Sequence, residues 1–370
     1  MIHFFKQRKD KKVINKIYKF FDKDIWVNGK INSKFEIKIK KFLKLKHNVI
    51  TCNSGSDALL ISLLLDKRKE KNIYLTSPIS YIASASIPKF LNLELIYIDV
   101  QKDNYLMSLD KLENFLENCP KKIRNRINGI INVELFGQTC DLNRLKKISK
   151  RYQLSLIGDC AQSFGSKYNN KSTISYYDFA TTSFYPTKIL SCYGDGGAIF
   201  FRGNYNKVFR LKNNGHDLKN KSICHQIGIN SRLDSIQALV LNDQITKLNN
   251  KIIIKKKIFN FYKKFIKINS HLRLVNNLNK KIKSNNYIFA IMINKKYRLK
   301  FINYMKKNGI DCKIFYKKLL SDNNVLKPIF KTDLRNSIKC SEELVCLPSS
   351  EELNYRQVNK IVKTINKLKF

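Results

Sequence analysis

The sequence predicts an α/β protein, in which a mainly parallel sheet is wrapped by helices and is followed by a smaller α+β domain. Between residue 51 and about residue 240, short apolar runs rich in strand-forming residues alternate with amphipathic stretches at helical spacing. This alternation is typical of strand–helix–strand units. Beyond about residue 266 it gives way to a few separate strand and helix patterns. With 370 residues, 43% of them hydrophobic, the chain is long enough for two packed units.

The elements of the larger unit follow in order. Residues 1–50 are basic and mostly helical in pattern, with a break at Trp26-Val27-Asn28-Gly29. The predicted strands are Asn72–Ser77, Leu93–Asp99, Ile127–Val133, Ser155–Gly158, Phe179–Ser183 and Gly197–Phe201. The predicted helices between them are Asp57–Leu65, Ser84–Leu91, Leu109–Glu117 and Leu142–Arg151. A long lysine-rich helix, or a pair of helices, is expected near residues 236–266.

Four later segments predict the smaller α+β domain. They are Tyr287–Ile293, Tyr297–Lys307, Asp311–Phe315 and Asn354–Leu368. We therefore expect an N-terminal arm and large domain over residues 1–250 and a small domain over residues 251–370. Because no Pro- or Gly-rich linker separates them, the two domains should pack closely.

Composition excludes several classes of protein. Only 19 residues are Pro or Gly, which argues against a disordered or collagen-like chain. No apolar run approaches the roughly 18 residues of a membrane span, and the N-terminal residues show no apolar leader. The nine cysteines are an odd number without a C-x-x-C pair, and the five histidines are scattered. We expect a cytoplasmic protein with reduced thiols, no metal site and no membrane partner.

The net charge of +43 would ordinarily point to nucleic acid. However, only 13 of the 71 basic residues are arginine, the side chain best suited to bidentate recognition of phosphates and bases. The lysines are spread along the chain beside abundant Ile and Asn, as A/T-rich codons would produce. A basic nucleic-acid binder is therefore the less favoured alternative. A positive surface would still concentrate anionic substrates.

Three motifs carry candidate chemistry. Ser54-Gly55-Ser56-Asp57 leads into a helix whose free amides and dipole could hold a phosphate, although an ordinary N-cap turn has the same pattern. Asp159 directly follows an apolar strand, where it either faces a ligand crevice or caps the next helix. Lys188 precedes the glycine-rich stretch Tyr193–Gly197 and could form a Schiff base if partly desolvated. In a lysine-rich chain, only its combination with the other two motifs singles it out.

In this order, the three motifs resemble the fold-type I enzymes that use pyridoxal 5′-phosphate. More narrowly, nearly the whole chain resembles the DegT/DnrJ/EryC1/StrS family of nucleotide-sugar aminotransferases. The segments that carry the resemblance are Trp26–Gly29 with Phe35-Glu36, Asn53–Leu59, Ser77–Ala85, Leu135–Gln138, Gly158–Gln162, Ser183–Lys188, Tyr193–Gly197 and Gly228–Ala238. The resemblance implies a large domain with a mainly parallel, seven-stranded type of sheet and a small α+β C-terminal domain.

The resemblance also implies roles for single residues. Lys188 would carry the cofactor and move protons, and Asp159 would pair with the pyridinium nitrogen so that the ring acts as an electron sink. Cofactor binding is implied for Ser56 and Asp57 through their amides, Ser183 through its hydroxyl, Tyr81 by stacking, Gln162 near the phenolic oxygen, and Asn230. Asn230 resembles a residue that reaches the phosphate from a second subunit, which implies a homodimer with shared sites.

The activity implied is transfer of an amino group, with L-glutamate as the expected donor, to a keto group of a nucleotide-linked hexose in surface-polysaccharide or amino-sugar biosynthesis. A 3-keto UDP- or dTDP-sugar is favoured over a 4-keto sugar. Many relatives have His at the position of Glu134 and Asn-His-Gly at Asn213-Asn214-Gly215, so these two departures concern substrate preference. Lys188 disfavours a dehydratase branch that has His there. The alternative from another class is a cofactor-binding regulator without turnover.

Overall fold

The computed structural model describes residues 1–5, 10–21, 25–66, 68, 70–217, 222–275 and 281–370. Seven strands form the main sheet in the order β1-β9-β8-β5-β4-β2-β3. Their bounds are β1 Asn48–Cys52, β2 Ile73–Thr76, β3 Glu94–Tyr97, β4 Ile127–Val133, β5 Ser155–Asp159, β8 Phe179–Ser183 and β9 Gly197–Phe201. Neighbours from β8 to β3 are parallel, and β9 is antiparallel to both β8 and β1. The predicted, mainly parallel sheet is confirmed.

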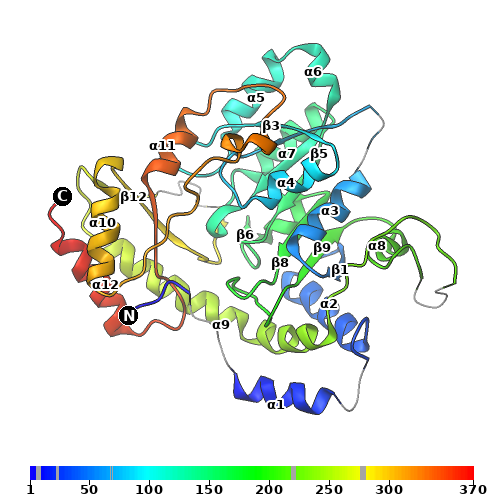
Figure 1. Cartoon of the computed structure of the whole chain (residues 1–370), viewed down its shortest axis with the longest axis horizontal. Helices are drawn as coiled ribbons and strands as arrows, with labels where there is room; N and C mark the ends of the chain where they lie inside the picture. Colours follow the sequence, from blue (N-terminus) through cyan, green and yellow to red (C-terminus); the bar gives the residue numbers. More distant parts are fainter. Residues whose placement is uncertain (6–9, 22–24, 67, 69, 218–221, 276–280) are drawn as a thin grey trace.

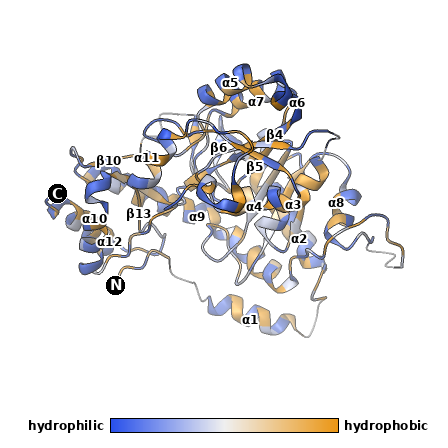
Figure 2. Ribbon diagram, turned by 45° about the horizontal axis from the view of Figure 1, so that its top comes forward, coloured by the Kyte–Doolittle hydropathy of each residue, from blue (hydrophilic) through white to orange (hydrophobic). Residues whose placement is uncertain are grey.

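Helices cover the sheet as the alternating pattern predicts (Figure 1). The four predicted helices are α3 Gly55–Asp66, α4 Ala83–Phe90, α5 Leu109–Asn118 and α7 Leu142–Arg151. Two more, α6 Lys121–Arg126 and α8 Tyr205–Lys212, were not predicted. Side chains cap several of them: Ser108, Asp141 and Asn204 each accept a hydrogen bond from an amide in the first turn. In α7 the buried residues recur at helical spacing, whereas its lysines are exposed, and its ribbon in Figure 2 carries both hydrophobic and hydrophilic residues.

A long helix, α9 (Ser235–Phe265), connects the main sheet to the C-terminal part of the chain. Its first half packs against α1 (Lys11–Phe20) and α2 (Lys30–Leu43). The predicted break before α2 contacts the start of α9, because the Trp26 carbonyl accepts a hydrogen bond from the Ser235 amide at 2.8 Å. The predicted domain boundary at residue 250 falls inside α9 and stays a prediction.

The C-terminal part contains a second, antiparallel sheet, ordered β10-β12-β13. Its elements are β10 Leu272–Leu274, β12 Phe289–Ile293, α10 Lys295–Lys307, α11 Arg335–Glu343, β13 Leu344–Leu347 and α12 Tyr355–Lys367. Phe289, Phe301 and Ile361 form its core together with Tyr262 of α9. Ile2 joins the same core, so the first residues of the chain lie with the C-terminal sheet.

Shorter elements complete the fold. A small sheet is formed by β6 Lys167–Tyr168, β7 Lys171–Ser172 and β11 Ile282–Lys283. Single 3-10 turns lie at Leu135–Gly137, Thr173–Tyr176, Leu320–Asp322 and Asn324–Leu326. Among the helices in the described ranges, none is long and apolar enough to cross a membrane.

The structure corrects the sequence-based elements in two places. Residues 48–50, assigned to the basic helical region, belong to strand β1, whose β-branched and apolar residues are buried between α2 and β9. Asp311–Phe315 is not a continuous strand, because only Lys313 forms a bridge, to Cys346 of β13. Strand β13 was not predicted, since it is a run of only four residues directly after helix α11.

Candidate active site

The carboxyl ends of three strands bring the predicted site residues together. Asp159 ends β5, Ser183 ends the neighbouring β8, and β1 leads directly into the loop before α3. Asp159 and Ser183 line one cavity of about 420 Å³. The same cavity is lined by Ser56, Tyr81, Gln162 and Lys188. Six of the eight predicted site residues therefore share one cavity. The exceptions are Asp57 and Asn230.

The start of α3 lies very close to the end of β8. A Cβ atom on Gly55 would lie 2.8 Å from Cβ of Ser183, so only glycine permits this approach. Ser54 caps the helix, since its Oγ accepts a hydrogen bond from the Asp57 amide at 3.0 Å. The Asp57 carboxylate accepts a hydrogen bond from Ser231 at 2.7 Å. Gly55, Ser56 and Ser183 line the cavity, and the free amides at the start of α3 could hold an anion there.

The Asp159 carboxylate is held by two donors. One oxygen accepts a hydrogen bond from Ser84 Oγ at 2.8 Å and the other from the Ala161 amide at 3.2 Å. Ser80 Oγ lies 2.6 Å from Ser84 Oγ and extends this network. The contribution of Ser84 was not predicted, although it lies in a segment that carries the family resemblance. Helix α4 brings it to the end of β5, which no local pattern specifies.

Lys188 follows β8 in a turn in which its amide donates to the Tyr185 carbonyl at 2.8 Å. Burial lowers the pKa of Lys188 to about 8, and the negative charge of Asp159 partly opposes this effect. The Nζ atom lies 5.5 Å from the centre of the Tyr287 ring. A substantial neutral fraction near physiological pH is the property that a nucleophilic lysine requires.

Two tyrosines from the C-terminal part close the cavity and were not predicted. Gln162 donates a hydrogen bond from Nε2 to Tyr316 Oη at 3.0 Å, while its Oε1 accepts from the Phe136 amide at 2.9 Å. Tyr287 and Tyr316 line the cavity, and burial raises the pKa of both phenols. They lie more than 120 positions from Gln162 in the sequence, so only the fold reveals them.

Glu134 also lines the cavity and is fully buried. Its carboxyl group accepts hydrogen bonds from Thr173 and Tyr177, both at 2.7 Å, and from Ser163. Burial raises its pKa in spite of these donors. Three hydroxyl groups therefore hold this buried carboxyl group in place.

Asn230 lies apart from the cavity in its own chain. Its backbone pairs with Asn213, and its side chain is exposed. Asn230 therefore does not line this cavity, although Ser231, Leu233 and Ala238 of the same motif are buried.

These residues fit pyridoxal phosphate. The cofactor needs an amine for its carbonyl carbon, a carboxylate for its ring nitrogen, donors for its phosphate and a flat group against its ring. Lys188, Asp159, the start of α3 with Ser183, and Tyr81 supply these four features on one cavity.

Comparisons with known proteins agree with this geometry. The model of the DegT/DnrJ/EryC1/StrS aminotransferase family matches residues 7–366. The UDP-2-acetamido-2-deoxy-3-oxo-D-glucuronate aminotransferase of Pseudomonas aeruginosa is 30% identical over 235 residues, which cover 63% of each chain. A pleiotropic regulatory protein of Geobacillus stearothermophilus is 27% identical over 354 residues, covering 92% of this chain and 90% of that protein.

A solved structure of a DegT DnrJ EryC1 StrS aminotransferase from Brucella abortus matches with a TM-score of 0.89 and 27% identity. The match covers 96% of this chain and 94% of that chain. The mainly parallel sheet and the cavity at its carboxyl edge thus define a fold-type I aminotransferase, as predicted. The chain belongs to the DegT/DnrJ/EryC1/StrS aminotransferase family.

Proposed function

We propose that the protein transfers an amino group from an amino acid, with L-glutamate as the preferred donor, to a keto group of a nucleotide-linked hexose. The cofactor is pyridoxal 5′-phosphate. The observation that carries this proposal is the placement of Lys188, with its pKa of about 8, and Asp159 on one cavity beside the start of α3. The name of the Pseudomonas relative supports the substrate class, and the family model supports the reaction type.

The bound cofactor would supply an electrophilic carbon and a ring that accepts electrons. Lys188 Nζ would hold the cofactor covalently and would then carry a proton between the donor carbon and the cofactor carbon. A general acid–base group in this position typically raises the reaction rate by about 10²–10⁴-fold. Asp159, fixed by Ser84 and the Ala161 amide, would keep the ring nitrogen protonated. Ser56 and Ser183 would bind the phosphate, with Tyr81 against the ring and Gln162 near the phenolic oxygen.

We further propose a homodimer, because the exposed Asn230 could contribute only to a site of a second copy. The Asp57 amide already donates a hydrogen bond to Ser54 Oγ, so it would have to share its hydrogen between that oxygen and the phosphate.

All nine cysteines are free, and eight are buried, which fits a reducing compartment such as the cytoplasm. Surface-polysaccharide or amino-sugar biosynthesis is the process in which such a reaction is used.

The donor half-reaction tests the function without knowledge of the sugar. Purified holoenzyme given L-glutamate alone should release about one equivalent of 2-oxoglutarate per site and lose the absorbance of its lysine-bound cofactor. A panel of UDP- and dTDP-linked ketosugars should then restore that absorbance. The absence of both changes would contradict the proposal.

The regulatory relative supports a second candidate, a cofactor-binding regulator without turnover. Such a protein would show the cofactor absorbance and no stoichiometric release of 2-oxo acid. The same half-reaction therefore separates the two candidates.

A further inference from the structure

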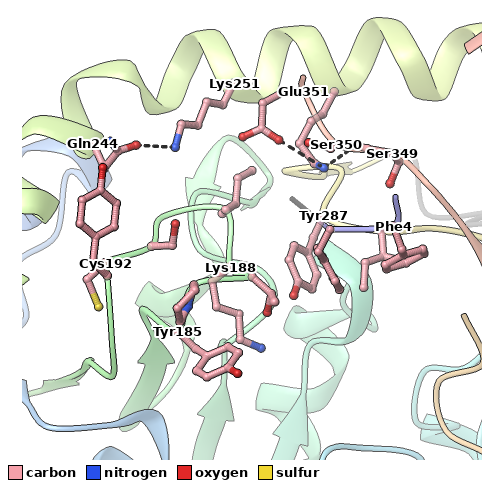
Figure 3. Close-up of a pocket in the computed structure, with 18 of the residues that line it drawn as sticks. Phe4, Tyr185, Lys188, Cys192, Gln244, Lys251, Tyr287, Ser349, Ser350 and Glu351 are labelled. Atoms are coloured by element: carbon pink, nitrogen blue, oxygen red, sulfur yellow. Dashed lines mark hydrogen bonds and ion pairs between the residues drawn. The ribbon is translucent and has the colours of Figure 1, made fainter. Parts of the chain in front are cut away.

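The segment Gly228–Ala238 connects two parts of the candidate site. Its last residues begin α9, the helix that runs above Lys188 in Figure 3 and borders a second cavity, of about 460 Å³. Lys188, Tyr185 and Tyr287 line this cavity as well as the first one. Ser231, just before α9, is fully buried and contacts the turn that leads into α3. None of the proposed roles uses this serine.

The Ser231 hydroxyl joins the two ends of the turn Asn53–Asp57, in which α3 begins. Its Oγ accepts a hydrogen bond from the Asn53 amide at 3.2 Å and donates one to the Asp57 carboxylate at 2.7 Å. An amide N–H can only donate and an ionised carboxylate can only accept, so the single hydrogen of the hydroxyl is committed to Asp57. Because Ser231 is fully buried, water does not compete for these two bonds.

The middle of the same turn is packed against the main sheet. A Cβ atom on Gly197 of β9 would lie 2.3 Å from the Ser54 carbonyl oxygen, and one on Gly55 would lie 2.8 Å from Cβ of Ser183. The turn is therefore in contact with β8 and β9 along its middle and with Ser231 at both ends.

The segment that carries Ser231 is itself tied to β1. The Ser231 amide donates to the Lys212 carbonyl at 2.9 Å, and the buried Nζ of Lys212 donates to the Thr51 carbonyl at 2.8 Å. Thr51 belongs to β1, which leads into the turn. The position of the serine is thus fixed relative to the strand before the turn.

The charge of Asp57 is unfavourable for a phosphate site. An acidic side chain in the first turn of a helix is stabilised by the helix dipole, but it repels an anion bound to the same amides. Asp57 does not line the cavity that holds Lys188, although Ser56 does. The hydrogen bond from Ser231 holds the carboxylate in this position.

We propose that Ser231 is a positioning residue for the cofactor phosphate. It keeps the Asp57 carboxylate out of the cavity and fixes the Asn53 amide, so that the free amides at the start of α3 remain available to the phosphate. This inference rests on the proposed function, in which that end of the cavity binds pyridoxal 5′-phosphate. Ser231 itself does not line the cavity and acts through Asp57.

The test compares the binding of two probes, pyridoxal 5′-phosphate and pyridoxal, to apoprotein by absorbance titration. The probes share the ring and the aldehyde and differ in the phosphate. Ser231→Ala should weaken the binding of pyridoxal 5′-phosphate by about tenfold, the order expected when a hydrogen bond to a charged group is lost. The binding of pyridoxal should stay unchanged, because it has no phosphate to be repelled.

Ser235→Ala is the matched control. Ser235 is a fully buried serine of the same segment, and its hydroxyl donates to Asn32 Oδ1 at 2.8 Å instead of to the turn before α3. The substitution removes a buried hydrogen bond of similar length and should change the binding of neither probe.

Asp57→Asn separates the charge from the packing, since it keeps the backbone amide and removes the carboxylate. In this background, Ser231→Ala should weaken the binding of pyridoxal 5′-phosphate much less than in the wild type, so the two substitutions are not additive. Thermal melting reports whether each variant is folded. If Ser231→Ala does not fold, Ser231→Cys, whose thiol is only a weak donor, replaces it and should show the same selective loss.

Three results would overturn the proposal: equal weakening of both probes by Ser231→Ala, unchanged binding of pyridoxal 5′-phosphate, or additive effects in the double variant. A wild-type protein that binds pyridoxal 5′-phosphate and completes the donor half-reaction, with any of these results, leaves the proposed function intact. A wild-type protein that binds neither probe contradicts the proposed function itself.

Discussion

The carboxylate of Asp159 interacts electrostatically with the amine of Lys188 across the cavity, although the two residues are 29 positions apart in the sequence. Burial lowers the pKa of the amine, and the carboxylate opposes that shift without cancelling it, which leaves a pKa of about 8. A lysine so tuned exchanges a proton near neutral pH, whereas an exposed lysine remains charged.

The first prediction concerns Lys188 itself. Lys188→Ala should abolish covalent attachment of the cofactor and turnover. Among the described residues, Lys188 is the only lysine that lines both the cavity of about 420 Å³ with Asp159 and the neighbouring cavity of about 460 Å³. Borohydride reduction followed by peptide mass spectrometry gives the measurement, with Lys256→Ala as control. A uniquely labelled lysine elsewhere in the mutant would show that the assignment is wrong.

Asp159→Asn should retain the cofactor but reduce kcat by orders of magnitude. The amide is similar in size to the carboxylate and can still accept from Ser84, but it cannot stabilise a protonated ring nitrogen. Steady-state kinetics beside a cofactor-content assay separate the two effects. Near-normal turnover in a fully loaded mutant would contradict the electron-sink role.

The pH dependence of cofactor capture follows from the pKa of Lys188. Only the neutral amine attacks a carbonyl, so the rate of covalent capture by apoprotein should rise with pH through a midpoint near 8. Asp159 raises this pKa, so Asp159→Asn should move the midpoint to lower pH. Stopped-flow absorbance measures the rate. A midpoint near that of free lysine, or an upward shift in the mutant, would disprove the electrostatic argument.

The sequence predicted the parallel sheet well because the alternation of apolar strands and amphipathic helices repeats over most of the chain. It also placed Asp159 and Ser183 correctly at strand ends, since a strand and its end are local features. Strands β1 and β13 were missed for the opposite reason. Each is a short buried run outside the regular strand–helix repeat, and such a run cannot be told from a buried helix segment by periodicity alone.

Side chains that complete the two cavities were largely invisible in the sequence. Tyr316 reaches Gln162 from 154 positions away, and Lys255 reaches the Ser349 carbonyl from 94 positions away. In a chain with 71 basic residues, no local pattern separates the buried Lys251 from an exposed neighbour. Such contacts depend on how the C-terminal sheet packs against α9, which is a tertiary property.

Gly55→Ala should destabilise the protein and weaken cofactor retention. The added Cβ would lie 2.8 Å from Cβ of Ser183, so α3 must shift away from the end of β8, at a cost of about 1–3 kcal/mol. Urea unfolding and cofactor dissociation kinetics give the two readouts. Gly194→Ala is the matched control, because its Cβ would meet only the flexible end of Gln237, at 3.1 Å. Equal behaviour of the two variants would rule out a steric requirement at Gly55.

The last prediction concerns Asn230 and assembly. In its own chain Asn230 is exposed, and it does not line the cavity that holds Lys188. If it contacts the cofactor phosphate, it does so in a second copy, and each site of a twofold-symmetric dimer is composite. Lys188→Ala and Asn230→Asp, the latter placing a negative charge against the phosphate, should each be inactive alone. A mixed dimer would contain one site with both defects and one with neither, so mixing after partial denaturation should restore up to about half of the wild-type activity per heterodimer. Each variant alone, taken through the same partial denaturation, provides the control. If both residues served one site from one chain, every site would stay defective and no mixture would recover, and a fully active monomer on a sizing column would exclude the composite site directly.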